Sequence, residues 1–200
     1  MKKNFTLLFF AFVSLAFSQA GAPATPYYNG FNWTLTGMNL KNALATKITT
    51  THTTTLTYSQ VWEALKIVDL DPANSSNVLL VYGWENGSDG DVTNDRSRNK
   101  NSNGGAVGDW NREHVFAQSL GNPDLGSSGP GADAQMLRSS DVQRNGTRGN
   151  RLFASGSGIN SFTVGTNGWY PGNEWKGDVA RIVMYMYLRY GSQCLPTYVT

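Results

Sequence analysis

The sequence is poor in the residues that usually build covalent or zinc-stabilised frameworks. Its 200 residues include one cysteine, Cys194, and two histidines. A single cysteine excludes an intramolecular disulfide bond, and it also excludes a zinc site made of several cysteines. Charged residues make up only 15% of the chain. Stability must therefore come from an apolar core, and any chemistry must depend on few titratable groups.

Long apolar runs are absent except at the start of the chain. A short basic head precedes an apolar run over residues 7–17, and small residues follow it. This order predicts a secretory signal peptide at residues 1–18, with cleavage between Ser18 and Gln19. We therefore expect an exported protein, extracellular or periplasmic, and no later segment is apolar enough to span a membrane.

Positive charge is not in excess once that peptide is removed. Removal of the peptide takes away two lysines, so the number of basic residues falls from 16 to 14 and equals the number of acidic residues, 14. The mature chain then has no overall basic field to steer it toward a polyanion. Any binding of nucleic acid must depend on local clusters of arginine and lysine.

The patterning of apolar and turn-forming residues predicts the α+β class. We find no internal repeat and no linker, so we expect one domain over residues 19–200. The expected helices are 37–47, 61–68 with Ser59 as N-cap, 142–151 capped from 139–141, and a core-packing C-terminal helix 177–190. The expected strands are 78–82, 110–116 and 133–138, and the expected loops are 49–57, 83–108, 121–132 and 155–173.

Residues 109–119 are the most informative stretch, because they place Glu113 directly before His114. An acid beside a histidine is common by chance, so the pair gains meaning only from a second polar segment at 144–151. A histidine titrates near neutral pH and can take a proton from water. Glu113 and Asn145 offer a carboxylate and an amide oxygen, and Mg²⁺ needs only one or two such protein ligands. This combination favours metal-assisted hydrolysis of a phosphodiester.

Hydrolysis of a phosphodiester also needs positive side chains at the phosphate. Arg144, Arg148 and Arg151 all lie in the second segment, and Arg98 lies in a basic run inside the expected loop 83–108. Neighbouring residues on a regular strand point to opposite faces. For Glu113 and its neighbour to serve one site, the strand must therefore end or twist there.

Three segments resemble a known family. Residues 111–119, Asn-Arg-Glu-His-Val-Phe-Ala-Gln-Ser, resemble the signature of the secreted and periplasmic endonuclease I family. Residues 133–150 look like the second half of that signature, and residues 176–181 with the following helix are similar to its closing helix. The resemblance covers roughly residues 27–190, which is the expected fold core. It implies a ββα-metal (His-Me finger) site, in which two strands and a helix surround one metal ion.

The resemblance also implies roles for single residues. His114 would be the general base, Glu113 and Asn145 would be the metal ligands, and an arginine, which we assign as Arg148, would steady the phosphate. Asn150 would brace the metal-bearing turn. The expected cofactor is one divalent ion, Mg²⁺, with Mn²⁺ or Ca²⁺ as alternatives.

The implied reaction is attack by water that leaves a 5′-phosphate and a 3′-hydroxyl. The expected partner is DNA, with RNA as a second candidate, held through its backbone by a monomer. Gln135 stands where the family often has a histidine, and it can hydrogen-bond but cannot titrate. Two other interpretations stay open: a secreted glycan-binding module, suggested by the six tryptophans, and a nuclease homologue that has lost its activity.

Overall fold

The structure is a computed structural model that describes residues 26–200, so the predicted signal peptide lies outside the described residues. The chain divides into two compact units, one up to Leu35 and one from Thr36 to Thr200. In the first unit the rings of Tyr28, Phe31 and Trp33 pack on one another, with centroids 4.6 to 5.8 Å apart. The second unit contains all the helices and strands described below.

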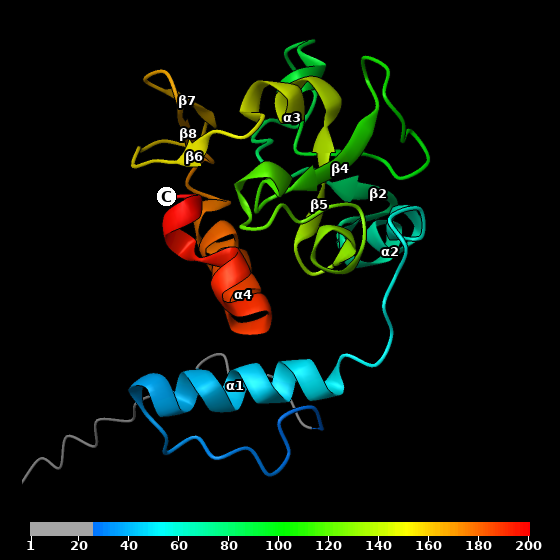
Figure 1. The fold of residues 1–200 in the computed structure, drawn as a ribbon. Coiled ribbons are helices and arrows are strands. Elements are labelled where there is room, and N and C mark those ends of the chain that lie inside the picture. The colour runs from blue at the N-terminus through cyan, green and yellow to red at the C-terminus, as the bar shows by residue number, and fades with distance from the viewer. Residues whose placement is uncertain (1–25) are drawn as a thin grey trace, which may run out of the picture. The chain divides into compact units, whose positions relative to one another are not determined.

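The second unit mixes helices with short strands, which confirms the predicted α+β class (Figure 1). Its helices are α1 (Gly37–Thr51), α2 (Val61–Val68), α3 (Val142–Arg148) and α4 (Lys176–Tyr190). Its strands are β1 (Leu70–Asp71), β2 (Asn74–Leu79), β3 (Ser97–Asn99), β4 (Trp110–His114), β5 (Leu137–Asp141), β6 (Leu152–Phe153), β7 (Phe162–Val164) and β8 (Gly168–Tyr170).

The strands form small separate sheets. The order in the first sheet is β1-β2-β3, β4 pairs with β5, and the third sheet has the order β6-β8-β7. The β4–β5 pair is antiparallel, with Trp110 opposite Asp141 and His114 opposite Leu137. Helix α3 follows β5 directly and lies beside both strands (Figure 1). The predicted order of strand, loop, strand and helix is therefore confirmed.

The start and the end of α3 follow from two residues. The side chain of Asp141 accepts a hydrogen bond from the backbone N–H of Arg144 at 2.8 Å, so the cap predicted within 139–141 is Asp141. This bond satisfies one of the free N–H groups at the helix start. Gly149 ends the helix with a φ of 55°, a conformation that glycine adopts without steric cost. The polar segment therefore forms a short helix, Val142–Arg148, that contacts β4.

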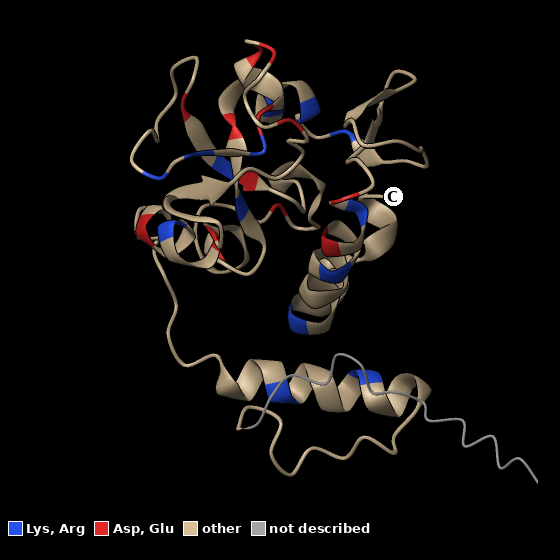
Figure 2. Cartoon of the chain, turned by 180° about the vertical axis from the view of Figure 1, so that it is seen from behind, with Lys and Arg blue, Asp and Glu red and all other residues tan. Residues whose placement is uncertain are grey.

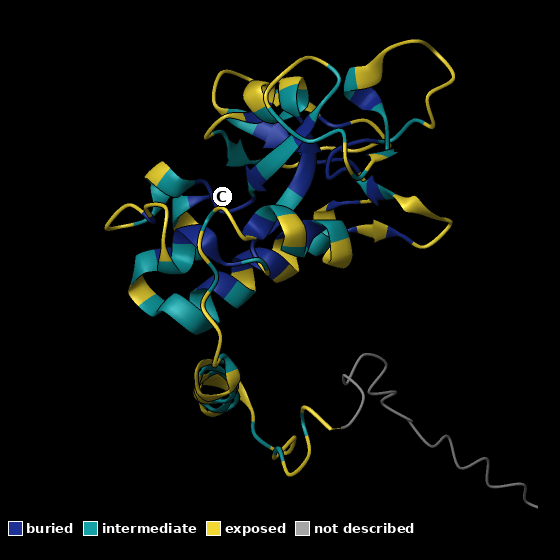
Figure 3. Cartoon of the chain, turned by 90° about the vertical axis from the view of Figure 1, so that its right-hand side faces the viewer, coloured by how far each residue is buried: buried dark blue, intermediate teal, exposed yellow. Residues whose placement is uncertain are grey.

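The apolar core lies within the second unit. Trp110 and Trp169 are fully buried, and Val179, Ile182, Val183 and Met186 of α4 pack into the same core. Figure 3 shows the buried positions on β4, β5 and one side of α4, with exposed positions on the outer loops. Burying a side chain of this size contributes about 1.5–3 kcal/mol. The prediction of a core-packing C-terminal helix is confirmed.

The predicted end of α1 and the predicted N-cap of α2 were wrong, whereas the predicted bounds of α2, 61–68, are confirmed. Helix α1 continues to Thr51 rather than ending near 47, and the hydroxyl groups of Thr50 and Thr51 donate to carbonyls one turn earlier. Helix α2 begins after Gln60 without a side-chain cap, so Ser59 is not its N-cap. Gln60 instead accepts a hydrogen bond from the backbone of Thr57 at 2.8 Å, which closes the turn before the helix.

The predicted strands needed larger corrections. The strand expected at 78–82 is β2 over Asn74–Leu79, because the chain leaves the sheet at Leu80 and Tyr82 has a φ of 76°. The strand expected at 133–138 begins only at Leu137, because the carboxylate of Asp133 accepts the N–H of Gln135 and holds a turn there. The predicted loops 83–108 and 155–173 contain β3, β7 and β8.

Charges of both signs are interspersed along the second unit, as Figure 2 shows. Helices α2 and α4 contain residues of both signs, whereas α1 and α3 contain basic residues only. Within residues 26–200, no helix combines the length and apolar character that crossing a bilayer requires. Whatever positive potential the protein uses must be built locally.

Candidate active site

A cavity of about 300 Å³ opens where β4 ends and α3 passes behind it. It is lined by Arg112, Glu113, His114, Ala117, Gln118, Ser119, Asp124, Asn145, Arg148, Gly149 and Asn150. Residues from both predicted segments therefore meet in one place. A larger cavity of about 560 Å³ beside α4 has a mostly apolar lining and contains none of the predicted site residues, so we take the smaller cavity as the candidate site.

The end of β4 explains how two neighbouring residues can serve one cavity. Glu113 is 1% exposed and turns toward Tyr82 and Arg148. His114 is half-buried and turns the other way, where its ring stacks on Tyr58 with centroids 5.5 Å apart. His114 is also the last residue of β4. The strand thus ends at this pair, as the sequence argument required.

Glu113 is held by one of its two oxygens. The hydroxyl of Tyr82 donates to Oε1 at 2.9 Å, and Nη1 of Arg148 lies 3.0 Å from the same atom. Within the described part of the chain, no hydrogen bond reaches Oε2. Burial raises the pKa of Glu113 to about 7, although Arg148 and the bond from Tyr82 both lower it. A cation beside Oε2 would favour the charged carboxylate.

Asn145 is oriented by a second asparagine. Its Nδ2 donates to Oδ1 of Asn111 on β4 at 2.7 Å. This bond leaves the amide oxygen of Asn145 without a hydrogen bond from another described residue. The cavity therefore has one carboxylate oxygen and one amide oxygen that receive no hydrogen bond from residues 26–200.

These two oxygens fit a hard divalent cation better than zinc. Among the residues that the structure describes, no three histidine, cysteine or carboxylate side chains cluster as a metal site would require. Zinc would need such a cluster. Mg²⁺ binds through one or two protein oxygens and keeps several water molecules. Glu113 and Asn145 are the side chains that would hold it.

The tautomer of His114 follows from its hydrogen bond. Its Nε2 lies 2.9 Å from the carbonyl oxygen of Gly131, which can only accept, so Nε2 donates. The lone pair of the neutral ring is then on Nδ1. Burial lowers the pKa of His114, and the positive charges of Arg112 and Arg148 lower it further, against the effect of the Gly131 bond. The ring is therefore neutral at pH 7 and can accept a proton.

Arg148 is buried and links α3 to the end of β4. Its side chain is fully buried, with Nη1 donating to the carbonyl of His114 at 2.7 Å and Nη2 to that of Val115 at 2.8 Å. The same guanidinium pairs with Glu113. Arg148 borders the cavity, and both of its Nη groups donate to backbone carbonyls, while its buried Nε has no hydrogen-bond partner among the described residues. The structure places it behind the end of β4, where the sequence argument expected an open phosphate contact.

The other predicted arginines do not line the cavity. Arg98 pairs with Asp141 at 2.7 Å and donates to the carbonyl of Asp109. Arg144 donates to the carbonyl of Thr93 at 3.0 Å and lies over the ring of Trp84. Arg151 donates to the carbonyl of Thr147, a contact within its own segment. All three support loops and turns around α3.

Two further predicted residues are also placed by the structure. Asn150 borders the cavity, with Nδ2 3.4 Å from the hydroxyl of Ser119. Gln135 is exposed and lines two other cavities instead. The ring of His114 donates to the backbone carbonyl of Gly131, so this hydrogen bond does not depend on the side chain at position 135.

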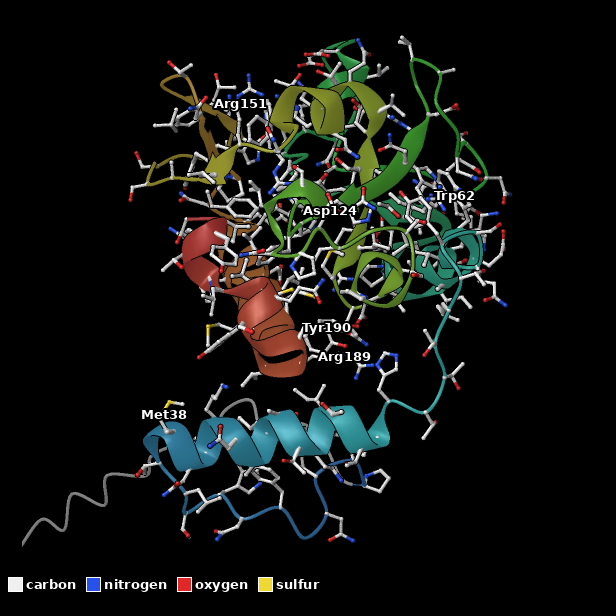
Figure 4. The ribbon with its side chains drawn as sticks, viewed as in Figure 1. Met38, Trp62, Asp124, Arg151, Arg189 and Tyr190 are labelled. Carbon is white, nitrogen blue, oxygen red and sulfur yellow. The ribbon has the colours of Figure 1, made fainter. Side chains whose placement is uncertain are left out.

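Sequence reasoning missed several residues that shape the cavity. These are Tyr58, Tyr82, Asn111, Arg112 and Asp124. Arg112 could have been found, because residues two apart on a strand share a face and Arg112 precedes His114 by two. Tyr58 and Tyr82 lie far from Glu113 and His114 in the sequence, so no local pattern predicts that they contact these two residues. Asp124, labelled in Figure 4, is exposed in the loop between β4 and β5.

Strands β4 and β5 form an antiparallel pair, α3 follows β5 directly, and Glu113 and His114 are the last two residues of β4. The chain belongs to the Endonuclease I family, whose profile matches residues 36–200. It is 46% identical over 182 residues to the extracellular ribonuclease of Bacillus subtilis (strain 168), covering 84% of this chain and 57% of that protein. It is 48% identical over 158 residues to the extracellular ribonuclease of Bacillus amyloliquefaciens, covering 77% of this chain and 50% of that protein.

The chain therefore spans about half the length of these two relatives. No solved structure matches it. The comparisons confirm the family resemblance stated from the sequence, and they leave the roles of single residues to be argued from geometry.

Proposed function

We propose that this protein is an exported, divalent-metal-dependent endonuclease that hydrolyses phosphodiester bonds of nucleic acid without base preference. One observation carries the proposal. A neutral histidine with a free Nδ1 borders the same cavity as a carboxylate oxygen and an amide oxygen that no described residue satisfies. The arrangement of β4, β5 and α3 around that cavity supports a ββα-metal site. The extracellular relatives support export.

In the proposed reaction each residue has one task. Nδ1 of His114 takes a proton from a water molecule while the oxygen of that water bonds to phosphorus. The bond from phosphorus to the 3′ oxygen breaks, and that oxygen takes a proton from solvent, which leaves a 5′-phosphate and a 3′-hydroxyl. Glu113 and Asn145 hold the metal ion, which when bound would neutralise charge developing on the phosphate and the leaving oxygen.

The nucleophile decides which nucleic acids can be cut. Because water attacks, the reaction needs no 2′-hydroxyl on the substrate, so both RNA and DNA fit the mechanism. The two Bacillus relatives are extracellular ribonucleases, which supports RNA as a substrate. A product with a 2′,3′-cyclic phosphate would contradict attack by water, and a 5′-phosphate with a 3′-hydroxyl would support it.

The central test is cleavage of plasmid DNA and of a long RNA by the purified protein. We expect activity with Mg²⁺, none with EDTA, and a loss of about 10²–10⁴-fold in His114→Ala. His52→Ala is the matched control, because the other histidine lines a different cavity and should keep full activity. Full activity in His114→Ala would remove His114 as the general base.

The ligand assignment has its own test. Calorimetric titration with Mg²⁺ or Mn²⁺ should show weaker binding in Glu113→Gln and in Asn145→Ala, while Gln135→Ala should bind as the wild type does. Unchanged affinity in both ligand variants would remove them as ligands. Binding of metal without cleavage in the wild-type protein would favour the inactive-homologue interpretation.

The glycan-binding alternative loses three of the six tryptophans on which it was based, whereas Trp33 is exposed. Trp110, Trp169 and Trp175 are buried in the core. Glycan binding needs aromatic side chains exposed together on one face, and these three tryptophans serve packing instead.

A further inference from the structure

The arginines of the chain differ in whether they have an acidic partner. Six of the nine arginines lie within ion-pair distance of a carboxylate: Arg96, Arg98, Arg138, Arg148, Arg181 and Arg189. Arg112, Arg144 and Arg151 have no such carboxylate among residues 26–200. Of these three, only Arg112 lines the cavity that contains Glu113 and His114.

The guanidinium of Arg112 is fixed in place by aromatic rings. Its central carbon lies 3.5 Å from the ring centroid of Tyr58 and 4.1 Å from that of Trp62. Its Nη1 donates to the backbone carbonyl of Tyr58. Trp62, labelled in Figure 4, belongs to α2 and packs in turn on the buried ring of Trp110. Stacking and one hydrogen bond therefore orient the group before any ligand arrives.

This fixed cation is left unsatisfied. Its Nε is buried and has no hydrogen-bond partner in the described part of the chain. No hydrogen bond from a described residue engages Nη2 either. Withdrawing a charged group from water without a counter-ion is unfavourable. A guanidinium kept in this state beside a cavity is prepared for an anion that comes from outside.

The position on β4 indicates which anion. Arg112 and His114 are two residues apart on the strand, so they share one face about 7 Å apart. Tyr58 covers both side chains on that face. A phosphodiester attacked by a water molecule on His114 would lie within reach of the guanidinium. Planar guanidinium groups recognise phosphate oxygens with two parallel hydrogen bonds.

We propose that Arg112, clamped between Tyr58 and Trp62, is the side chain that contacts a non-bridging oxygen of the substrate phosphate. This inference rests on the proposed function, because it assumes that a phosphodiester occupies the cavity. It reassigns the phosphate contact that the sequence argument gave to Arg148, which is committed to holding the end of β4.

The test measures binding separately from cleavage. Fluorescence anisotropy with a labelled DNA duplex in EDTA gives the dissociation constant at several salt concentrations. Each phosphate neutralised contributes about 0.9 to the slope of log affinity against log salt. We expect Arg112→Met to lower that slope by about 0.9 and to lower kcat/KM with Mg²⁺ by about 10- to 100-fold. Arg181→Met, which removes an exposed arginine paired with Asp178, should leave both unchanged.

The variant Arg112→Lys tests the positive charge of the side chain separately from the planar shape of the guanidinium group. It should keep the salt slope, because the charge remains, but should lose activity, because an ammonium group cannot form the paired hydrogen bonds. A wild-type slope in Arg112→Met, measured where circular dichroism shows the variant folded, would overturn the inference. If Arg112→Met does not fold, wild-type kcat/KM in Arg112→Lys would overturn it. A wild-type protein that binds the duplex but does not cleave it would contradict the proposed function alone, and the slopes would still decide the role of Arg112.

Discussion

Glu113 shows how a single carboxylate can be divided between two tasks. Oε1 is held by Tyr82 and Arg148 in the core, and Oε2 is left for a ligand. The partners of a metal-binding side chain set its orientation and its basicity, and losing one typically weakens metal binding about 10- to 100-fold. Burial and the Glu113 carboxylate raise the pKa of Tyr82 well above its ordinary value, so its hydroxyl remains a donor.

We predict that Tyr82→Phe weakens Mg²⁺ binding about 10-fold or more and lowers the free energy of unfolding by about 1–3 kcal/mol. The first effect arises because Oε1 loses a donor, and the second because a buried acceptor is left with one partner. Calorimetric metal titration and urea unfolding measure the two quantities.

Tyr185→Phe is the matched control for that change. It also removes a tyrosine hydroxyl from a carboxylate, Asp133, but Asp133 does not line the candidate site. It should lower stability without changing metal affinity. An equal loss of metal affinity in the two variants would show that the effect is general loosening of the fold and not the orientation of Glu113.

At the scale of elements, α3 is fastened to β4 by one side chain. Arg148 joins the last turn of α3 to the carbonyls of His114 and Val115 and to the carboxylate of Glu113. The orientation of Glu113 and His114 therefore depends on a helix that follows them by about thirty residues. Breaking a buried ion pair from one side typically costs about 3–5 kcal/mol, because the other charge stays buried.

We predict that Arg148→Met destabilises the fold by about 3–5 kcal/mol, measured by urea unfolding at pH 7. Arg148→Lys should lose less, since it keeps a charge beside Glu113 but cannot reach both carbonyls. A residue that only contacted the substrate would show the opposite pattern: low activity with the stability of the wild-type protein. That result would return Arg148 to the role that the sequence argument assigned.

Asp69 joins three elements and is a second buried charge with a measurable consequence. It ends α2, its carboxylate accepts the N–H of Ser139 on β5 at 2.7 Å, and its carbonyl accepts the N–H of Leu79 on β2. Burial raises the pKa of Asp69 to about 6, although Arg138 and the Ser139 bond both lower it. An acid whose pKa is raised by folding stabilises the fold below its unfolded pKa, and this contribution is lost as pH rises through the folded pKa.

We predict that the wild-type protein loses stability relative to Asp69→Asn between pH 4 and pH 6.5, by up to about 3 kcal/mol. The difference between the two proteins isolates Asp69 from other carboxylates, and urea unfolding at several pH values measures it. A difference that does not change with pH, or that grows in favour of the wild type as pH rises, would contradict the prediction.

At the scale of the whole molecule, charges of both signs are dispersed along the chain, and several helices and strands contribute side chains to one apolar core. Acidic and basic positions both occur along the second unit (Figure 2), and the described residues have no net excess of positive charge for long-range steering. The core links α2, β4, β5 and α4 through buried aromatic and aliphatic side chains. In the proposed assignment, the positive charge that contacts the phosphate therefore comes from one arginine beside the cavity, Arg112.

The sequence alone determined the class of fold, the family and the two segments that meet. Those conclusions depend on local signals, namely the period of α4, the cap at Asp141 and the Glu113-His114 pair, which neighbouring residues specify. The short strands β3, β7 and β8 escaped prediction because each has three residues, which is too few to show a reliable period.

Only the tertiary structure decided how the side chains are used. Whether an arginine is free depends on the carboxylates and carbonyls that other segments bring to it. Arg148 finds its partners on β4, whereas Arg112 finds two aromatic rings and no carboxylate among the described residues. Similarly, the backbone of Gly131 sets the tautomer of His114. Such partners come from positions far apart in the chain, so local sequence could name the candidates but could not assign their roles.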